Sequence, residues 1–401
     1  MNQLRILFVD DDPNILRGLQ RMLHRHRDKW NLEFADSGHA ALQLLESRPV
    51  EIVISDMRMP EMDGAKLLDH IKSEHPETVR GILSGQADQD QTVSVIGRTH
   101  FYLSKPCSPR SLTSAIERIE QAFQAMPNPE LRKRILTMES VPSTPQNLER
   151  LRVMLADANC DIMQVGQIVA TDVGLSARIL QLVCSSFLGQ PRTDVKVADA
   201  VAGLGRGILA KLIDMPGFAL PLANAEWFPL DQFLGERRLI AELAGKIAEA
   251  ESAPADVQAA SYNAGWLTGL GPLVLASIYP EQYKRVLTDL PNSNRSLVEA
   301  ERASFGCHQA NVSGFVAGVW GLPNAIVTAV SSLFSDSADS APQGDFSATT
   351  AVQVASALVA MRLESKDEMT PFLDRDSLAR LDATFLNRLA DWQSLASDSI
   401  S

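Results

Sequence analysis

The 401-residue sequence lacks the features that mark several specialised classes of protein. No uninterrupted apolar run reaches the roughly 18 residues of a membrane-spanning helix, and the N-terminus leads into acidic residues without the apolar stretch of a signal peptide. The four cysteines are scattered and form no C-x-x-C pair, which disfavours a zinc knuckle or a disulfide framework. We therefore expect a cytoplasmic protein with reduced thiols.

Positive charge and histidine are also scarce. Lys and Arg number 37 against 49 Asp and Glu, and the net charge of -12 disfavours a nucleic-acid backbone as the main partner. Of the seven histidines only His308 follows His100, so an imidazole-rich metal site is not expected beyond residue 100. Hydrophobic residues make up 45% of the chain, which is ordinary for a globular protein and sufficient for two or three domains.

Short β-branched and apolar runs alternate with helical patterns over residues 1–125. Helix signals follow these runs: Ser37 and Ser108 suit N-caps, and Pro13 and Pro109 suit a first helical turn. The runs that predict strands are residues 5–9, 32–35, 51–55, 79–84 and 100–104. This β-α rhythm predicts an α/β doubly wound, parallel five-stranded sheet, in which ligands bind beyond the carboxyl ends of the strands.

Polar side chains stand at those carboxyl ends. Asp10 and Asp11 end the first predicted strand, and Asp56 ends the third. Their carboxylates are expected to converge on an oxygen-rich site that suits Mg²⁺, whose charge relieves their repulsion. Ser84 ends the fourth strand and Lys105 the fifth, where a hydroxyl and an ammonium group suit the oxygens of a phosphoryl group.

The motifs VDDD (9–12), SDMRMPEMDG (55–64), LSG (83–85) and YLSKP (102–106) resemble those of the receiver domain of bacterial response regulators. The resemblance implies a flavodoxin-like fold in which Asp56 accepts a phosphoryl group from a histidine kinase or phosphotransfer protein. It also implies that Mg²⁺ is held by Asp10, Asp11, Asp56 and the backbone carbonyl of Arg58.

The same resemblance implies roles for residues near the other strand ends. Lys105 contacts the phosphoryl group, and Ser84 and Tyr102 reorient when it arrives. Pro106 is expected to follow a cis peptide bond, and Asp12 to face solvent at the start of the first helix. The face formed by the fourth helix, fifth strand and fifth helix is then expected to change its contacts on phosphorylation, through homodimerisation or release of an output domain.

The character of the sequence changes after the first 125 residues. Residues 126–139, with Pro127 and Pro129, predict a short linker, and residues 140–335 have nearly continuous helical periodicity. The segments that resemble the HDOD domain, an all-helical relative of the HD phosphohydrolases, are residues 141–155, 168–189, 200–209, 264–275 and 305–326. Residues 336–401 predict a loop and C-terminal helices that pack on this domain or, alternatively, bind a partner or form a dimer.

HD enzymes bind metal through histidines and aspartates, and this sequence lacks the corresponding ligands. Thr268 and Gly269 stand where the His-Asp pair is expected, and Glu236 stands near the position of the first histidine. Glu236 is expected on a solvated helix face, and His308 is expected to be hydrogen-bonded or solvated. We therefore predict that the output domain is not an enzyme and that the only chemistry is phosphorylation and dephosphorylation of the receiver.

Together these features predict a two-component response regulator in which phosphorylation of Asp56 controls a non-catalytic HDOD-like domain that binds a downstream signalling protein. The alternative is a regulator whose output is a metal-dependent phosphohydrolase of nucleotides or cyclic dinucleotides, which the missing histidines disfavour. A transcription factor is a third possibility. Because no basic recognition helix is found, neither nucleic acid nor a membrane is expected as a partner.

Overall fold

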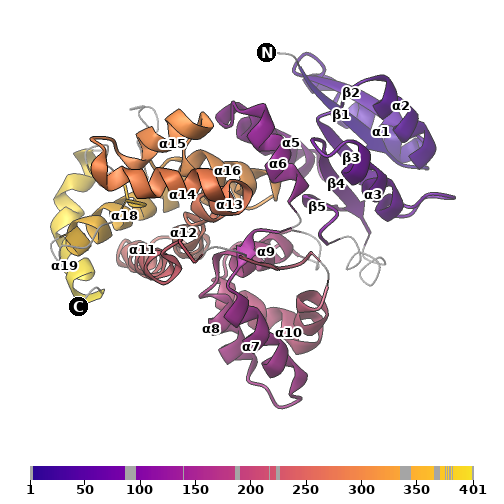
Figure 1. Cartoon of the computed structure of the whole chain (residues 1–401). Helices are drawn as coiled ribbons and strands as arrows, with labels where there is room; N and C mark the ends of the chain where they lie inside the picture. Colours follow the sequence, from indigo (N-terminus) through magenta and orange to yellow (C-terminus); the bar gives the residue numbers. More distant parts are fainter. Residues whose placement is uncertain are drawn as a thin grey trace.

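Figure 1 shows the computed structural model, in which a parallel sheet with its helices lies beside a larger helical body. The structure describes residues 3–85, 96–138, 140–185, 190–215, 217–222, 226–334, 345–364, 371–374, 376, 378, 381 and 383–399. The helix expected between the fourth and fifth strands falls largely on residues 86–95, outside the described part of the chain.

Five strands form the N-terminal sheet, and all of its neighbouring strands run parallel. The strands are β1 (Leu4–Val9), β2 (Trp30–Ala35), β3 (Ile52–Asp56), β4 (Val79–Ser84) and β5 (Phe101–Ser104). Their order, β2-β1-β3-β4-β5, is that of a doubly wound sheet, which confirms the predicted fold of this half. Strand β3 is buried along its whole length, because helices cover both faces of the sheet.

Two of the helices around the sheet begin at the predicted N-caps, Ser37 and Ser108. The side chains of Asp12, Ser37 and Ser108 each accept a hydrogen bond from a backbone N–H in the first turn. Asp12 is exposed, as predicted. These helices are α1 (Pro13–Met22), α2 (Gly38–Ser47), α3 (Gly64–Glu74) and α5 (Pro109–Ala125), with a 3₁₀ turn at His24–His26.

The predicted linker contains a packed helix. Helix α6 (Pro129–Thr137) occupies most of residues 126–139 and buries Leu131 and Leu136. Asn128 caps this helix and also donates a 2.7 Å hydrogen bond to the carbonyl of Phe305 in the helical body. The segment therefore holds the two domains in contact in addition to connecting them.

Among its described residues, the C-terminal body is helical apart from one short strand pair and connecting turns. Strands β6 (Pro142–Ser143) and β7 (Leu220–Pro221) pair in parallel, a small departure from the all-helical prediction. The helices are α7 (Pro145–Ala156), α8 (Ile162–Val169), α9 (Val173–Cys184), α10 (Val197–Ile213), α11 (Leu230–Ala250), α12 (Ala255–Leu267), α13 (Leu270–Ile278), α14 (Pro280–Asp289), α15 (Leu297–Phe305), α16 (Gln309–Val319) and α17 (Asn324–Ser331). Figure 1 shows α7, α8, α9 and α10 as a lobe below the other helices.

The C-terminal helices pack on this body. Helix α18 (Ala348–Glu364) is buried along nearly its whole length and contacts α11, α12 and α17. A 3₁₀ segment (Ala383–Arg388) and α19 (Leu389–Ser399) follow it. Trp392 Nε1 donates a 3.0 Å hydrogen bond to Glu251, the C-cap residue of α11. Most of the loop predicted at 336–347 lies outside the described residues.

Helix α5 also contacts the helical body. It lies beside α16 in Figure 1, and the two helices are in direct contact. The ring centres of Phe123 and Phe315 are 5.7 Å apart, and a Cβ on Gly318 would stand 3.0 Å from the Cβ of Ala122. Apolar burial across this contact therefore joins the two domains.

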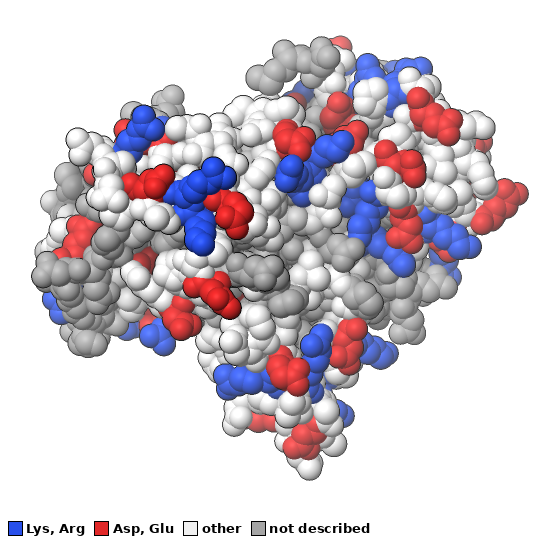
Figure 2. Space-filling view, viewed as in Figure 1, with Lys and Arg blue, Asp and Glu red and all other residues white. Residues whose placement is uncertain are grey.

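Within the described residues no single helix has the length and apolar composition of a membrane span. Helices α8 and α9 have that length and composition only when they are counted together, and they are bent by 114° where they meet. Figure 2 shows basic and acidic side chains interspersed over the visible face. Because neighbouring charges of opposite sign offset each other, no extended field of one sign is expected over this face.

Candidate functional site

The carboxyl edge of the parallel sheet brings two aspartates and a lysine together. Asp10 follows β1, Asp56 ends β3 and Lys105 follows β5. Lys105 Nζ lies 2.6 Å from Asp10 Oδ2 and forms a second ion pair with Asp56 Oδ1. Asp10 and Asp56 are only 1% and 7% exposed, so two buried carboxylates share one ammonium group.

Burial and neighbouring charge control the ionisation of this cluster. Burial raises the pKa of Asp56, Lys105 opposes the rise, and the Asp10 carboxylate adds to it. Burial by itself would lower the pKa of Lys105, but its bonds to Asp10 and Asp56 raise it. The lysine therefore stays charged and supplies the counter-charge that two adjacent carboxylates require.

Backbone contacts fix the two carboxylates. The N–H of Asp12 donates to Asp10 Oδ1 at 3.0 Å, and the N–H of Arg58 donates to Asp56 Oδ2 at 2.9 Å. A Cβ at Gly64 would stand 2.2 Å from the carbonyl oxygen of Asp56, so the loop after β3 needs glycine to return this close to the strand. Each carboxylate thus has one oxygen on the backbone and the other on the lysine.

The third predicted carboxylate, Asp11, is exposed in the loop after β1. Across the described residues no three His, Cys, Asp or Glu side chains meet in a metal-binding arrangement, so the structure does not bring Asp10, Asp11 and Asp56 together as predicted. The donor set nevertheless fits a hard cation. The buried carboxylates of Asp10 and Asp56 carry more negative charge than one lysine balances, and carboxylate and carbonyl oxygens, such as that of Arg58, are the ligands Mg²⁺ prefers.

The predicted switch residues lie on β4 and β5. Ser84 Oγ donates to the carbonyl of Gly85 at 3.3 Å. Tyr102 is 4% exposed, and burial raises its pKa to about 12. The Lys105-Pro106 peptide bond is cis, as predicted. The tyrosine is covered because the helical domain lies against this side of β5, where both line one cleft.

Helix α9 of the helical domain is bonded to the backbone next to Tyr102. Gln181 Nε2 donates a 2.6 Å hydrogen bond to the carbonyl of His100, and Gln181 Oε1 accepts one of 2.8 Å from Arg178. The Arg178 guanidinium lies 4.5 Å from the ring centre of Trp320. Its charge also acts on Tyr102, opposing the rise in pKa that burial causes. Two buried polar residues of α9 therefore reach the switch strand.

His100 and Arg80 tie helix α6 to the same region. The backbone N–H of Arg80 donates to His100 Nδ1 at 2.9 Å, and the carbonyl of Leu136 lies 3.2 Å from both Arg80 Nη2 and His100 Nε2. Burial and the charge of Arg80 lower the pKa of His100 well below its ordinary value, so the imidazole is neutral. Sequence reasoning missed His100 and Gln181, because residues that are 81 positions apart leave no local pattern.

Arg237 connects Thr268 and Glu236, two residues that were expected near the metal-binding positions of HD enzymes. Arg237 donates a 3.2 Å hydrogen bond to Thr268 Oγ1 and forms a 3.2 Å ion pair with Glu236. Glu236 and Arg237 are 2% and 1% exposed, so the prediction that Glu236 lies on a solvated helix face is wrong. Its charge is tolerated inside because the guanidinium balances it. His308 is also buried and is the N-cap residue of α16.

A second buried acid, Glu301, has no cation as its partner in the described contacts. It accepts hydrogen bonds of 2.8 Å from the hydroxyl of Tyr283 and from the N–H of Gln309. Burial raises the pKa of Glu301 to about 7, although both hydrogen bonds favour the carboxylate. This group was not predicted, since nothing in its sequence neighbourhood separates it from a surface glutamate.

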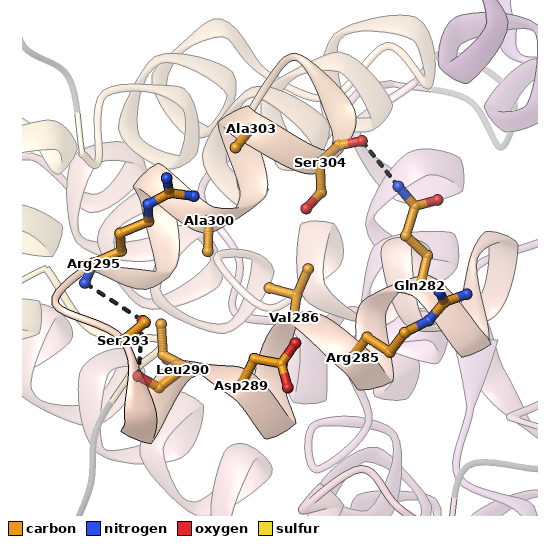
Figure 3. A pocket seen from close by; sticks show the side chains of 10 residues that line it. All are labelled: Gln282, Arg285, Val286, Asp289, Leu290, Ser293, Arg295, Ala300, Ala303 and Ser304. Atoms are coloured by element: carbon orange, nitrogen blue, oxygen red, sulfur yellow. Dashed lines mark hydrogen bonds between the residues drawn. The ribbon is translucent and has the colours of Figure 1, made fainter.

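Figure 3 shows a surface cavity of about 290 Å³ between α14 and α15. Arg285 and Arg295 lie on opposite sides of it, and Asp289 lies between them. Gln282 Nε2 donates a 2.9 Å hydrogen bond to the carbonyl of Ser304 across its edge. All three charged residues are exposed, so the cavity holds charges of both signs that water screens.

Protein families match both halves of the chain. The Response regulator receiver domain matches residues 6–117, and the HDOD domain matches residues 141–333. The chain is a receiver–HDOD response regulator. The sheet with its strand-end carboxylates is the receiver, and the helices from α7 to α17 are the HDOD domain. Both resemblances stated from the sequence are confirmed.

Similar proteins share parts of this receiver–HDOD chain. Transcriptional regulatory protein GlrR of Escherichia coli (strain K12) is 30% identical over 163 residues, 40% of this chain and 36% of GlrR. Heme response regulator HssR of Staphylococcus aureus (strain JH9) is 31% identical over 129 residues, 32% of this chain and 56% of HssR. The chain thus spans between about a third and somewhat over half of the length of these relatives.

Two solved structures are also similar to the receiver–HDOD chain. The signal receiver domain of an HD domain-containing protein from Pseudomonas fluorescens Pf-5 is 38% identical and covers 28% of this chain and 90% of that one, with a TM-score of 0.27. The MmoQ response regulator from Methylococcus capsulatus (strain Bath) is 20% identical and covers 61% of this chain and 91% of that one, with a TM-score of 0.45.

Proposed function

We propose that the receiver accepts a phosphoryl group on Asp56 from a histidine kinase or phosphotransfer protein. The buried cluster of Asp10, Lys105 and Asp56 carries this proposal. Asp56 is the nucleophile, and Lys105, already bonded to it, balances the charge of the incoming phosphoryl oxygens. Asp10, Asp56 and the carbonyl of Arg58 would hold Mg²⁺, and Asp11 would have to turn inward from the loop after β1 to join them. The ion would supply positive charge where a phosphate approaches the carboxylates.

The signal passes to the HDOD domain through strand β5. Tyr102 is buried beside Arg178, and Gln181 is bonded to the carbonyl of His100. When Lys105 and Ser84 turn toward the phosphoryl group, β5 shifts, and both contacts with α9 depend on its position. Phosphorylation therefore loosens the HDOD domain from the receiver and makes its surface available to a downstream signalling protein.

The HDOD domain acts by binding and not by hydrolysis. Supporting this, the guanidinium of Arg237 stands between Glu236 and Thr268, where a metal-dependent hydrolase needs a divalent cation. An ion pair that is buried and balanced in this way has no charge left to attract a metal ion. This observation favours a binding module over the phosphohydrolase alternative.

The first prediction tests the phosphoacceptor. Incubation of the full chain with a small phosphodonor and Mg²⁺ is expected to add one phosphoryl group, and Asp56→Asn is expected to abolish the addition, because an amide is not a nucleophile. Intact-mass spectrometry measures the mass increase. Asp11→Asn serves as the comparison, since it weakens Mg²⁺ binding but leaves the nucleophile in place. Equal phosphorylation of wild type and Asp56→Asn would show that another residue accepts the group.

The second prediction tests the output domain. Purified protein is expected to contain no stoichiometric transition metal by elemental analysis, and to leave cyclic dinucleotides and nucleoside phosphates intact. The physical reason is the Glu236–Arg237 pair, in which the guanidinium already supplies the positive charge that a metal ion would bring to the carboxylate. Hydrolysis that persists in Asp56→Asn but disappears in Glu236→Gln or His308→Ala would establish the phosphohydrolase alternative.

A further inference from the structure

A cleft of about 380 Å³ opens between the receiver and the HDOD domain. The receiver contributes β5 and the first turns of α5, and the HDOD domain contributes the end of α9, residues 191 and 193, and the turn after α16. This volume is of the size that small-molecule sites have in proteins. Tyr102 lines the cleft, so a ligand bound beside it would contact the residue through which phosphorylation is proposed to act.

The cleft is lined by hydroxyl groups and one cation. Its serine and threonine residues are Ser104, Ser108, Ser111, Ser114, Ser185 and Thr193, and Tyr102 adds a phenol hydroxyl. Arg118 supplies the only charge among the lining residues that the structure describes, although the charge of Asp194 acts nearby on Cys184. The described walls of the cleft therefore hold an arginine and no carboxylate, in a chain with a net charge of -12.

Arg118 is half-buried in the wall of the cleft and has no carboxylate as its partner among the described residues. Its guanidinium donates one hydrogen bond, of 3.3 Å, to the amide oxygen of Asn324, and its buried Nε has no hydrogen-bond partner. No carboxylate of the described chain lies within ion-pair distance of it. Burial accordingly lowers the pKa of Arg118 to about 10. The guanidinium is therefore partly desolvated and balanced by one neutral hydrogen-bond partner, and a bound anion would supply the missing counter-charge.

Two further features favour an anion. Helix α5 begins at this cleft, with Ser108 as its N-cap, so the positive end of its dipole lies there. The cavity of Figure 3 offers a comparison within the same molecule: it also contains arginines, but Asp289 lies between them and all of these charges are exposed. Of these two sites, the cleft between the domains alone combines a partly desolvated cation with walls of hydroxyl donors.

We propose that the cleft between receiver and HDOD domain binds a small phosphate-bearing molecule, with Arg118 as its charge partner. The guanidinium presents paired N–H groups that match two phosphate oxygens, and the serine hydroxyls donate to the remaining oxygens. Because residues of both domains surround the ligand, the ligand stabilises the arrangement in which the receiver and the HDOD domain are in contact. By linkage, a ligand that favours this arrangement opposes phosphorylation of Asp56, and phosphorylation weakens its binding.

The test is a calorimetric titration of the full chain with inorganic phosphate and with inorganic pyrophosphate. The parent protein carries Asp56→Asn and Mg²⁺ is omitted, so that the phosphoacceptor site does not contribute. Saturable binding is expected for at least one probe. Arg118→Met is expected to weaken it by about tenfold or more, the loss of a charge-assisted bidentate contact. Arg110→Met is the matched control, because this arginine is on the same helix but exposed and outside the cleft.

A second control separates binding from domain contact. Asn324→Ala removes the hydrogen bond that Arg118 makes across the interface while keeping the cation, and is expected to bind both probes as the parent does. If Arg118→Met does not fold, Arg118→Lys replaces it and is expected to bind more weakly than the parent, because lysine lacks the planar fork. The proposal is overturned if neither probe binds saturably to the parent, or if Arg118 and Arg110 variants bind equally.

Discussion

Buried carboxylates differ in what balances them. Asp56 has the ammonium group of Lys105 beside it, and Glu236 has the guanidinium of Arg237. Glu301 instead accepts hydrogen bonds from a hydroxyl and a backbone N–H, which stabilise a carboxylate less than a full positive charge does. Desolvation therefore dominates at Glu301, whose pKa rises to about 7.

The pKa of Glu301 predicts a pH-dependent stability. Its ordinary value is 4.5, so as pH rises from there to about 7 the unfolded chain releases this proton while the folded chain keeps it. The free energy of unfolding then falls by on the order of 3 kcal/mol over this pH range. Above about pH 7 the ionisation of Glu301 causes no further change. Glu301→Gln stays neutral throughout, so its stability relative to wild type is expected to increase over the same range.

Urea denaturation at about pH 5 and about pH 8 measures this change. The control is Glu281→Gln, an exposed glutamate on the neighbouring helix α14, for which no change of this size is expected between the two conditions. A difference between wild type and Glu301→Gln that is the same at both pH values would show that Glu301 does not retain its proton in the folded state.

At the scale of elements, helices α13 and α16 approach each other at Gly271. A Cβ at this position would stand 1.9 Å from the carbonyl oxygen of Gln309. Gly271→Ala is therefore expected to push the helices apart and to reduce the free energy of unfolding by about 2–4 kcal/mol. Gly207→Ala on α10 has nothing within 4 Å of the new methyl group and is expected to be neutral or stabilising by up to about 1 kcal/mol.

Chemical denaturation of the full-length variants measures both effects. Both substitutions add the same methyl group to a helical glycine, so their difference reports the close contact and not helix propensity. Equal stabilities of the two variants would mean that α13 can move away from Gln309 without loss of packing.

At the scale of elements, helix starts and strand ends could be predicted from the sequence, because a few consecutive residues determine them. N-caps such as Ser37 follow from local patterns. The strand ends that place Asp10, Asp56 and Lys105 at one edge follow from parallel topology. The linker prediction gave the prolines too much weight as helix breakers: Pro129 is in the first turn of α6, where its missing N–H costs nothing. The buried Glu236 could not be predicted, because its partner and its burial depend on tertiary packing.

At the scale of the whole molecule, the receiver and the HDOD domain are in contact through α5, α6 and α9. This arrangement could not be deduced from the sequence of either domain alone. The motifs of each domain specify its own fold and do not indicate which of its surfaces contacts the other domain. The contacts of α9 involve the side chain of Gln181 and the backbone of His100, the residue before β5. The unphosphorylated receiver is therefore stabilised by a domain that comes later in the chain.

Removal of one of these contacts is expected to favour phosphorylation. Gln181→Ala deletes the 2.6 Å hydrogen bond to His100, which is worth about 1 kcal/mol, and is expected to speed phosphorylation by a small phosphodonor about fivefold. Gln167→Ala, at an exposed glutamine of α8 in the same lobe, is the control. Time-resolved intact-mass spectrometry measures the rates, and equal rates for both variants would contradict the proposed coupling through α9.

Phosphorylation itself is expected to change backbone protection on both sides of the contact. Hydrogen exchange should become faster in β5 and α5 of the receiver and in α9 and α16 of the HDOD domain, because these elements face each other. The comparison is wild type against Asp56→Asn under the same phosphodonor. Exchange that changes only within the receiver would show that the signal stops at β5.

Helix α5 packs on the receiver and on α16 at the same time, and this has a consequence for how such proteins are inherited and engineered. The match to the receiver family ends at residue 117, in the middle of a helix that runs from Pro109 to Ala125. A recombination point placed there would give α16 a foreign surface in place of Ala122 and Phe123. A working exchange of receivers must therefore carry α5, α6 and the facing side of α16 together, so the portable unit is larger than the receiver domain.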